Sequence, residues 1–243
     1  MRDQFAEQLK KECMELSLVL TDLQVQQFYR YYELLIEWNQ VMNLTTITEM
    51  NEVITKHFVD SLSIVKVFED LEEKKWSLID VGTGAGFPGI PLKIVFPKLR
   101  ITLLDSLNKR VKYLNQVIEE LGLSEIEAIH GRAEEFGSQV LYREKFNLCV
   151  SRAVANISTL SEYCLPFVSV DGLFVSYKSG KVEEELNAGK HAVFLLGGKV
   201  KEICLFPLPG NEGERSLIVI EKKEKTARRY PRKAGMPSKE PLK

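Results

Sequence analysis

Leu78-Ile-Asp-Val-Gly-Thr-Gly-Ala-Gly-Phe-Pro-Gly89 is the stretch that decides the fold. It opens on a short apolar run of the kind that a buried parallel strand shows. Four glycines follow, Gly82, Gly84, Gly86 and Gly89, and after them comes an apolar segment compatible with a helix. A strand, a glycine-dense turn and a helix in succession predict the first crossover of a nucleotide-binding α/β sheet. Glycine allows a ligand to touch the backbone, and the turn directs free N–H groups of the next helix toward that ligand.

Beyond this stretch the pattern alternates between strands and helices. We expect strands at 76–81, 100–105, 125–129, 146–150 and 172–176, and helices at 88–96, 107–121, 156–169 and 181–196, with a short helix after Gly131. Two further strands, 200–206 and 216–221, are joined by a hairpin-type loop without a helix. This is the plan of a class I methyltransferase: an α/β, Rossmann-like, mostly parallel seven-stranded sheet whose last, antiparallel strand inserts beside the fifth. A dehydrogenase domain more often continues with a sixth parallel strand.

Helices are expected before the sheet and a basic tail after it. Thr21-Asp-Leu-Gln24 fits a capping box that begins a helix running to about Met42, and a second helical segment covers 50–68. The predicted organisation is an N-terminal helical extension over 1–70, a cofactor-binding core over 71–222 and a tail over 223–243.

Charge is unevenly distributed along the chain. The net charge is −1, but residues 221–243 carry +6 and the first 220 carry −7. An acidic body with a basic tail indicates a polyanionic partner, although a solvated, disordered terminus is the commoner explanation. No apolar run approaches the ~20 residues of a membrane span. Four scattered cysteines indicate reduced thiols in a cytoplasmic protein, and no histidine lies at zinc-ligand spacing from them, so no metal is expected.

The glycine turn fits two ligand classes. From Gly84 it matches the dinucleotide fingerprint G-x-G-x-x-G, with Asp105 about 20 residues on. From Asp80 it matches the acidic-x-G-x-G-x-G signature of S-adenosylmethionine (SAM) enzymes. Asp80 favours SAM, because its carboxylate would face the cationic amino-acid part of SAM but would repel a pyrophosphate. A dinucleotide remains the alternative.

Three further residues stand after expected strands, where ligands bind in such sheets. Asp105 is placed to accept both ribose hydroxyls, or to cap the next helix. Glu134 is placed to accept the adenine amino group. Arg152 is a candidate for the cofactor carboxylate, the guanine O6 or a phosphate, or for a surface salt bridge.

The methyl acceptor is inferred from absences. The segment Ser151-Arg-Ala-Val-Ala-Asn156 lacks the Asn/Asp-Pro-Pro-Tyr/Phe motif of amino methyltransferases, and Cys149 sits within a strand pattern rather than in a loop where it could act as a nucleophile. These absences favour a target that is already nucleophilic, such as guanine N7, which needs orientation and desolvation but no general base.

Taken together, the chain resembles the bacterial 16S rRNA guanine-N7 methyltransferase family, RsmG or GidB, nearly end to end. The segments that carry the resemblance are Trp38-Asn-Gln-Val-Met-Asn-Leu-Thr45, Lys56-His-Phe-Val-Asp-Ser-Leu62, Asp80–Pro91, Leu104-Asp-Ser-Leu-Asn-Lys-Arg110, Gly131-Arg-Ala-Glu134, Ser151–Ala155 and Arg229–Leu242. The resemblance implies SAM as cofactor and a guanine in a small-subunit rRNA loop near the decoding centre as target. It implies cofactor positions at Gly82, Phe87, Ala133, Glu134 and Arg152.

Contacts to RNA are expected from Lys178, after the fifth strand, and from the tail residues Arg228, Arg229, Arg232 and Lys233. The prolines and glycine of the tail favour an extended arm that becomes ordered on RNA. Losing the tail should then weaken RNA binding and spare SAM. We expect a monomer acting on the small subunit away from membranes. The alternatives are an inactive RNA-binding module on a methyltransferase fold and an NAD-dependent oxidoreductase.

Overall fold

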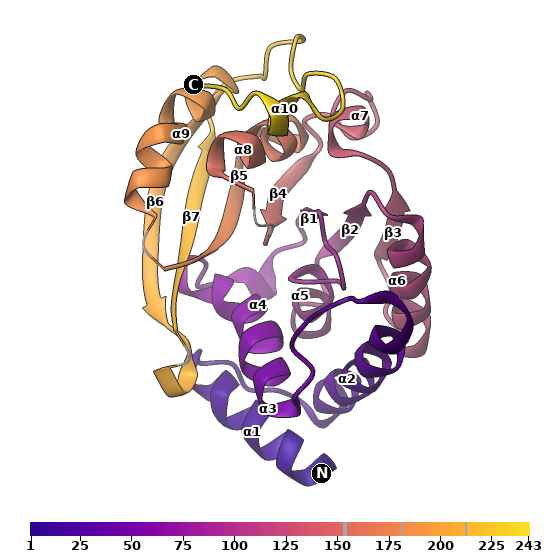
Figure 1. Cartoon of the computed structure of the whole chain (residues 1–243). Coiled ribbons are helices and arrows are strands. Elements are labelled where there is room, and N and C mark those ends of the chain that lie inside the picture. The colour runs from indigo at the N-terminus through magenta and orange to yellow at the C-terminus, as the bar shows by residue number, and fades with distance from the viewer. Residues whose placement is uncertain (153–154, 181, 212) are drawn as a thin grey trace.

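A seven-stranded sheet forms the centre of the molecule (Figure 1). The computed structural model describes residues 1–152, 155–180, 182–211 and 213–243; part of the Ser151–Ala155 motif, the start of the expected helix at 181 and one hairpin-loop position lie outside them. The strand order is β3-β2-β1-β4-β5-β7-β6. The strands are β1 Ser77–Val81, β2 Arg100–Asp105, β3 Ile126–His130, β4 Phe146–Ser151, β5 Val168–Ser179, β6 Gly198–Pro207 and β7 Glu214–Lys222.

The sheet has the topology expected of a class I methyltransferase. The strands β1 to β5 pair in parallel, whereas β7 pairs antiparallel with both β5 and β6. The predicted insertion of the last strand beside the fifth is therefore confirmed. A sheet of this order reverses its winding at β1 and β4, so ligands are expected at the carboxyl ends of those strands.

The helices lie on both faces of this sheet (Figure 1). Among the described residues they are α1 Arg2–Glu15, α2 Asp22–Met42, α3 Met50–Val53, α4 Asp60–Leu62, α5 Gly89–Val95, α6 Asn108–Glu120, α7 Ala133–Phe136, α8 Ile157–Cys164, α9 Glu183–Leu195 and α10 Met236–Lys239. The capping box at Thr21 is present, with the Thr21 hydroxyl accepting from the Gln24 N–H. Within the described ranges, no helix combines the length and apolarity needed to cross a membrane.

Alternation along the strands produces two cores. Leu78 and Leu148 point to the face covered by the N-terminal helices, α5 and α6, where one apolar cluster extends from Phe5 to Val219. Their neighbours Ile79 and Cys149 point to the opposite face, which α8 and α9 cover. Successive strand side chains face opposite ways, so strands buried on both faces read as continuous apolar runs.

Two expected helices are shorter or less regular than their patterns indicate. The helix expected at 156–169 ends at Cys164, because Pro166 lacks the N–H that an α-helix requires and Val168 already pairs with Phe146 as the start of β5. The segment expected as one helix over 50–68 runs through α3, π-helical turns at Ile54–Val59, α4 and a 3₁₀ turn at Ser63–Lys66.

The basic tail differs most from expectation, since it is folded onto the body. It passes over α8 beside α7 (Figure 1), and α10 packs against α8. Arg143 donates hydrogen bonds to the carbonyls of Thr226 and Tyr230, at 2.6 and 2.8 Å. Tyr230 and Pro231 are buried. The prediction of an arm that orders only on RNA was therefore wrong, because side chains distant in sequence supply its docking surface.

Candidate active site

The glycine turn closes tightly over the end of β1 and is held from below by α2. Gly86 has φ +97°, and a Cβ at this position would lie 2.6 Å from the Tyr31 hydroxyl. That hydroxyl donates a 2.5 Å hydrogen bond to the Ala85 carbonyl. Gly82 and Gly84 also have positive φ, at 72° and 62°. The turn therefore depends on glycine for its backbone conformation and on the N-terminal helices for its support.

Asp80 lies beneath the turn rather than at its surface. The side chain is fully buried, and its Oδ2 accepts hydrogen bonds from the Thr83 hydroxyl at 2.6 Å and the Gly89 N–H at 2.9 Å. Burial raises the pKa of this carboxyl to about 7, despite these two hydrogen bonds, which lower it. Asp80 thus shapes the turn from inside through Oδ2, whereas its Oδ1 has no hydrogen-bond partner among the described residues. A contact between Asp80 and a ligand ammonium group stays a prediction.

Asp105 at the end of β2 connects the turn to the next loop. Its Oδ2 accepts from the Gly84 N–H and its Oδ1 from the Leu107 N–H, both at 2.9 Å. The helix α6 begins after Leu107 without a side-chain cap, so the alternative reading of Asp105 as its N-cap does not hold. An ionised carboxylate offers about four acceptor positions, which leaves capacity for ribose hydroxyls.

A pocket of about 200 Å³ lies against the turn and is called here the turn pocket. Three predicted residues line it: Gly82, Ala133 and Glu134. The remaining lining residues are Val81, Leu104, Ser106, Gly131, Arg132, Ala155, Leu160 and Tyr163. Sequence reasoning missed Leu160 and Tyr163, which come from α8 and belong to no motif. Apolar walls with one carboxylate suit a flat heterocycle that carries an amino group.

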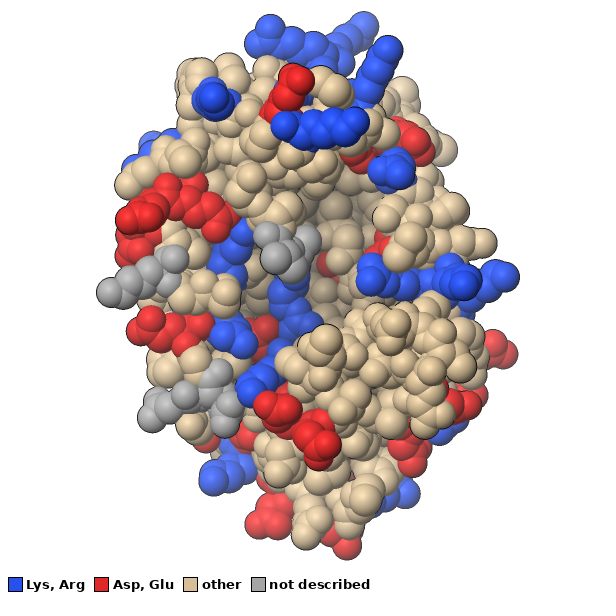
Figure 2. Space-filling model, in the orientation of Figure 1, with Lys and Arg blue, Asp and Glu red and all other residues tan. Residues whose placement is uncertain are grey.

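A second cavity, of about 550 Å³, is rich in basic side chains and is called here the basic cavity. It is lined by Leu44, Lys56, His57, Asp60, Arg152, Tyr177, Lys178, Ser179, Glu185 and Arg215. Figure 2 shows Lys and Arg side chains along a hollow on this face. The two spaces adjoin, because Ala155 lines the turn pocket while its carbonyl accepts a 2.5 Å hydrogen bond from Lys178 of the basic cavity.

Arg152 is fixed within the basic cavity by a buried carboxylate. Its Nη1 lies 2.8 Å from Oδ2 of Asp60, which is only 4% exposed. Asp60 also receives Arg215, at 3.2 Å from Oδ1. The Arg152 guanidinium stands over the Phe87 ring, 4.9 Å from its centroid. Arg152 is therefore not part of a surface salt bridge. The Phe87 ring lies between α2 and the Arg152 guanidinium.

His57 completes the cluster as a neutral ring. It stacks on Phe87 with centroids 4.7 Å apart, and its Nδ1 lies 3.2 Å from Nη2 of Arg152. A guanidinium only donates, so Nδ1 must accept and the proton sits on Nε2, 2.8 Å from the Thr45 hydroxyl. Burial and then the charge of Arg152 lower the pKa of His57 to about 3. His57 and Asp60 belong to a segment quoted for the family resemblance, yet neither was expected as a partner of Arg152.

The predicted RNA-contacting residues fall into two groups. Arg228, Arg229 and Lys233 are exposed on the folded tail. Arg232 instead forms a fork-like ion pair with Glu162, whose side chain has no exposed surface, with Nη2 2.7 Å from Oε2. The prediction of Arg232 as an RNA contact was therefore wrong, since its charge is used internally. Lys178 is nearly buried and paired with Glu185 at 2.7 Å, but it does line the basic cavity.

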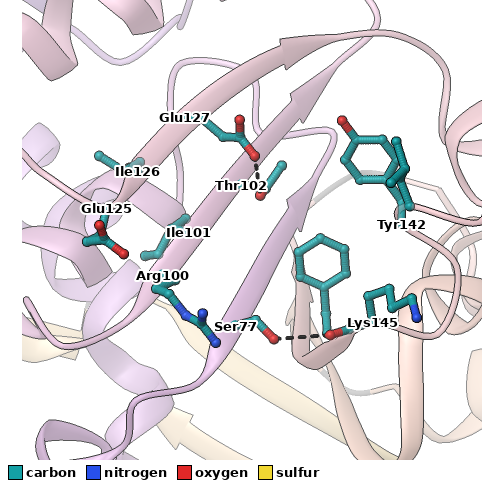
Figure 3. Close-up of a pocket in the computed structure, with 11 residues that line it drawn as sticks. Ser77, Arg100, Ile101, Thr102, Glu125, Ile126, Glu127, Tyr142 and Lys145 are labelled. Carbon is teal, nitrogen blue, oxygen red and sulfur yellow. Dashed lines mark hydrogen bonds between the residues drawn. The ribbon is translucent and has the colours of Figure 1, made fainter.

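Another cavity, of about 570 Å³, contains none of the predicted residues. It lies over the amino-terminal halves of β1, β2 and β3, where Thr102 donates to Glu127 (Figure 3). Ligands of open α/β sheets bind outside the carboxyl ends instead, so this cavity is not assigned to the site. In the part of the chain that the structure describes, no group of His, Cys, Asp or Glu side chains is arranged to hold a metal.

Comparison with known proteins adds the family. The model described as "rRNA small subunit methyltransferase G", GidB, matches residues 24–217. A ribosomal RNA small subunit methyltransferase G of Alkaliphilus metalliredigens is 51% identical over 235 residues, covering 97% of this chain and 98% of the relative. One of Lachnoclostridium phytofermentans is 53% identical over 227 residues and 93% of each chain.

Among solved structures, TrmN from Thermus thermophilus has the same fold. The TM-score is 0.52 at 13% identity, over 68% of this chain and 48% of that one. The family model spans most of the chain, and both relatives match almost its full length. The chain with this glycine turn, turn pocket and basic cavity therefore belongs to the rRNA small subunit methyltransferase G family, GidB.

Proposed function

We propose that this protein is a SAM-dependent methyltransferase that modifies N7 of a guanine in 16S rRNA. The proposal rests on one observation: the turn pocket and the basic cavity lie next to each other at the carboxyl ends of β1 and β4. One has apolar walls and a carboxylate, and the other is lined by four basic side chains. Family membership favours the same activity, and nothing in the site favours a nicotinamide cofactor.

The turn pocket fits the adenosine part of SAM. Leu104 and Leu160 supply apolar walls, and Glu134 supplies an acceptor for an exocyclic amino group. Asp105 is fixed by two backbone N–H groups near the turn, in a position suited to ribose hydroxyls. When bound, SAM supplies an electrophilic methyl group on a sulfonium. The role of the protein is to exclude water and to hold the acceptor in line.

The basic cavity fits the acceptor side. The guanine N7 lone pair needs no base, and the candidate bases of the cavity are engaged. His57 is hydrogen bonded through both nitrogens, both oxygens of Asp60 pair with arginines, and Glu185 pairs with Lys178. Arg152 then acts as a donor toward guanine O6, a phosphate or the cofactor carboxylate, the three ligands that its chemistry allows. We assign it as the residue closest to the transfer.

Three exposed cations and one within the basic cavity extend this site toward the rest of the RNA. Arg228, Arg229 and Lys233 lie on the tail surface, and Lys178 lies in the basic cavity. We propose that they contact phosphates around a loop near the decoding centre. We further propose that the protein acts as a monomer in the cytoplasm, with the small ribosomal subunit as its partner.

Methyl transfer is the direct test. The full-length protein is incubated with methyl-labelled SAM and small subunits isolated from cells that lack the modification. Label in 16S rRNA is expected, and fully modified subunits serve as the control that should take up none. SAM binding without label would leave only the inactive-module alternative. Binding of NAD in place of SAM, measured by calorimetry, would indicate the oxidoreductase.

A further inference from the structure

The folded tail is attached to α8 at two points. Arg232 makes a fork-like pair with the fully buried Glu162, and its backbone N–H donates a third hydrogen bond, of 2.8 Å, to the same carboxylate. Five residues further on, the Pro237 carbonyl accepts a 3.0 Å hydrogen bond from Thr159. Bidentate arginine pairs are among the strongest and most directional polar contacts in proteins. The segment between these points is therefore held in a defined place.

That segment touches the turn pocket. The Gly235 N–H donates a 2.7 Å hydrogen bond to Oε1 of Glu134, which lines the pocket. Burial raises the pKa of the Tyr163 phenol, and a hydrogen bond with Ser238 lowers it. Tyr163 lines the same pocket. The Glu134 wall of the pocket is thus hydrogen bonded to the tail.

The geometry of Gly235 explains how the contact is made. Its φ is +82°, in the left-handed region that glycine adopts without strain, and there it precedes the short helix α10. Its N–H occupies Oε1 of Glu134 and leaves Oε2 for a ligand. Glu134 is only 7% exposed and lies in a helix of a single turn, α7.

We propose that residues 232–239 are part of the cofactor site and position Glu134 for the adenine amino group, so that docking of the tail and binding of SAM are coupled. This inference rests on the proposed function. It differs from the expectation from the sequence, in which the tail binds RNA and only the body binds SAM. Gly235, Arg232 and Pro237 are positioning residues, because none of them reaches the reacting atoms.

A truncated chain tests the coupling. Ending the chain at Ala234 removes the Gly235 N–H but keeps the pair between Arg232 and Glu162. SAM should bind about tenfold more weakly, as expected for losing a hydrogen bond to a charged group. The KM for SAM should rise by the same factor while kcat at saturating SAM is unchanged. A chain ending at Glu240 keeps the contact and is the matched control, with no change expected.

A double-mutant cycle shows whether the truncation acts through Glu134 or through a general loss of structure around the pocket. In a Glu134→Ala background, the truncation at Ala234 should change the SAM Kd by less than about twofold, because its target is gone. Equal losses in both backgrounds, or no loss in the natural one, would overturn the inference. A full-length chain that fails to bind SAM would instead overturn the proposed function.

A full-length variant guards against a truncation that does not fold. Arg232→Lys keeps the charge beside Glu162 but loses the fork, so the tail should dock less tightly and SAM should bind about threefold more weakly. Arg100→Lys, at an exposed position that lines neither the turn pocket nor the basic cavity, is the control and should bind like the natural protein. Equal SAM affinity of these two variants, with unchanged melting temperatures, would contradict the coupling.

Discussion

At the scale of single residues, His57 and Asp80 titrate in opposite senses. The pKa of His57 falls from 6.5 to about 3, chiefly through burial, and the pKa of Asp80 rises from 3.8 to about 7 for the same reason. Between about pH 4 and 6.5, His57 is protonated in the unfolded chain but neutral in the folded chain. The free energy of unfolding therefore rises with pH through this group. Asp80 keeps a proton in the folded chain that the unfolded chain releases, so its contribution falls with pH.

These opposing contributions predict what His57→Gln will do. The variant lacks the stability that His57 adds as the pH rises. Between about pH 4.5 and 6, the slope of its unfolding free energy against pH should therefore be lower than that of the natural protein, by at most about 1.4 kcal/mol per pH unit. Urea titrations at several pH values measure the slope. His191→Gln, at an exposed histidine, is the control. The same slope in both variants would contradict the low pKa of His57.

Arg152 carries the second prediction at this scale. Arg152→Lys keeps the charge but loses the simultaneous contacts with Asp60 and His57 and the flat stacking on Phe87. The single-turnover rate of methyl transfer should fall about ten- to a hundredfold, which corresponds to about 1.4–3 kcal/mol. Arg215→Lys likewise keeps the charge while altering the other ion pair of Asp60, and it should cost less. A rate unchanged by Arg152→Lys would exclude it from the transfer step.

At the scale of elements, α2 supports the glycine turn through one buried hydroxyl. Tyr31→Phe leaves the buried Ala85 carbonyl without its donor, which should lower the free energy of unfolding by about 1–3 kcal/mol. Tyr113 on α6 is a matched control, since it is equally buried but its hydroxyl has no hydrogen-bond partner among the described residues. Tyr113→Phe should cost nothing. Similar losses in denaturant titrations of both variants would contradict this role of α2.

The sequence predicts elements well where one local pattern determines them. The capping box at Thr21 and the apolar runs of the strands depend on neighbours within a few residues, and all seven strands are present. The tail was mispredicted because Arg232 pairs with Glu162, 70 residues away, and no local pattern reveals such a partner. The same holds for Arg152, whose carboxylate partner, Asp60, lies 92 residues earlier.

Among the site residues, too, those placed by a local pattern were predicted and those placed by the surrounding fold were not. Gly82, Ala133 and Glu134 were predicted and line one pocket, because a strand end followed by a short turn places them directly. Asp80 was predicted as a ligand contact, and the structure adds a second role, since its Oδ2 turns inward to Thr83 and Gly89. Its use inside the turn could not be inferred without knowing how the backbone folds around it.

At the scale of the whole molecule, a body of net charge −7 carries a basic tail of +6 that is folded against it. Replacing the exposed Arg228, Arg229 and Lys233 by Ala should weaken RNA binding and reduce the slope of log K against log salt by about 2. SAM affinity should stay unchanged, because none of the three side chains lines the turn pocket and replacing Lys233 by Ala keeps the backbone of the docked segment. Replacing Lys190, Lys199 and Lys201, exposed on α9 and β6, is the control. Equal slopes for both triple variants would contradict phosphate contacts by the tail.

We propose that the two adjoining spaces bring a methyl donor to the N7 of one guanine. Methylation at N7 makes the RNA backbone cleavable by borohydride and aniline, so the modified position can be mapped on 16S rRNA after reaction with the purified protein and SAM. We expect a single new cleavage, at a guanine in a loop near the decoding centre, and its loss when SAM is omitted. Methyl label incorporated without any new cleavage would contradict the account, since the acceptor would then be an atom other than N7.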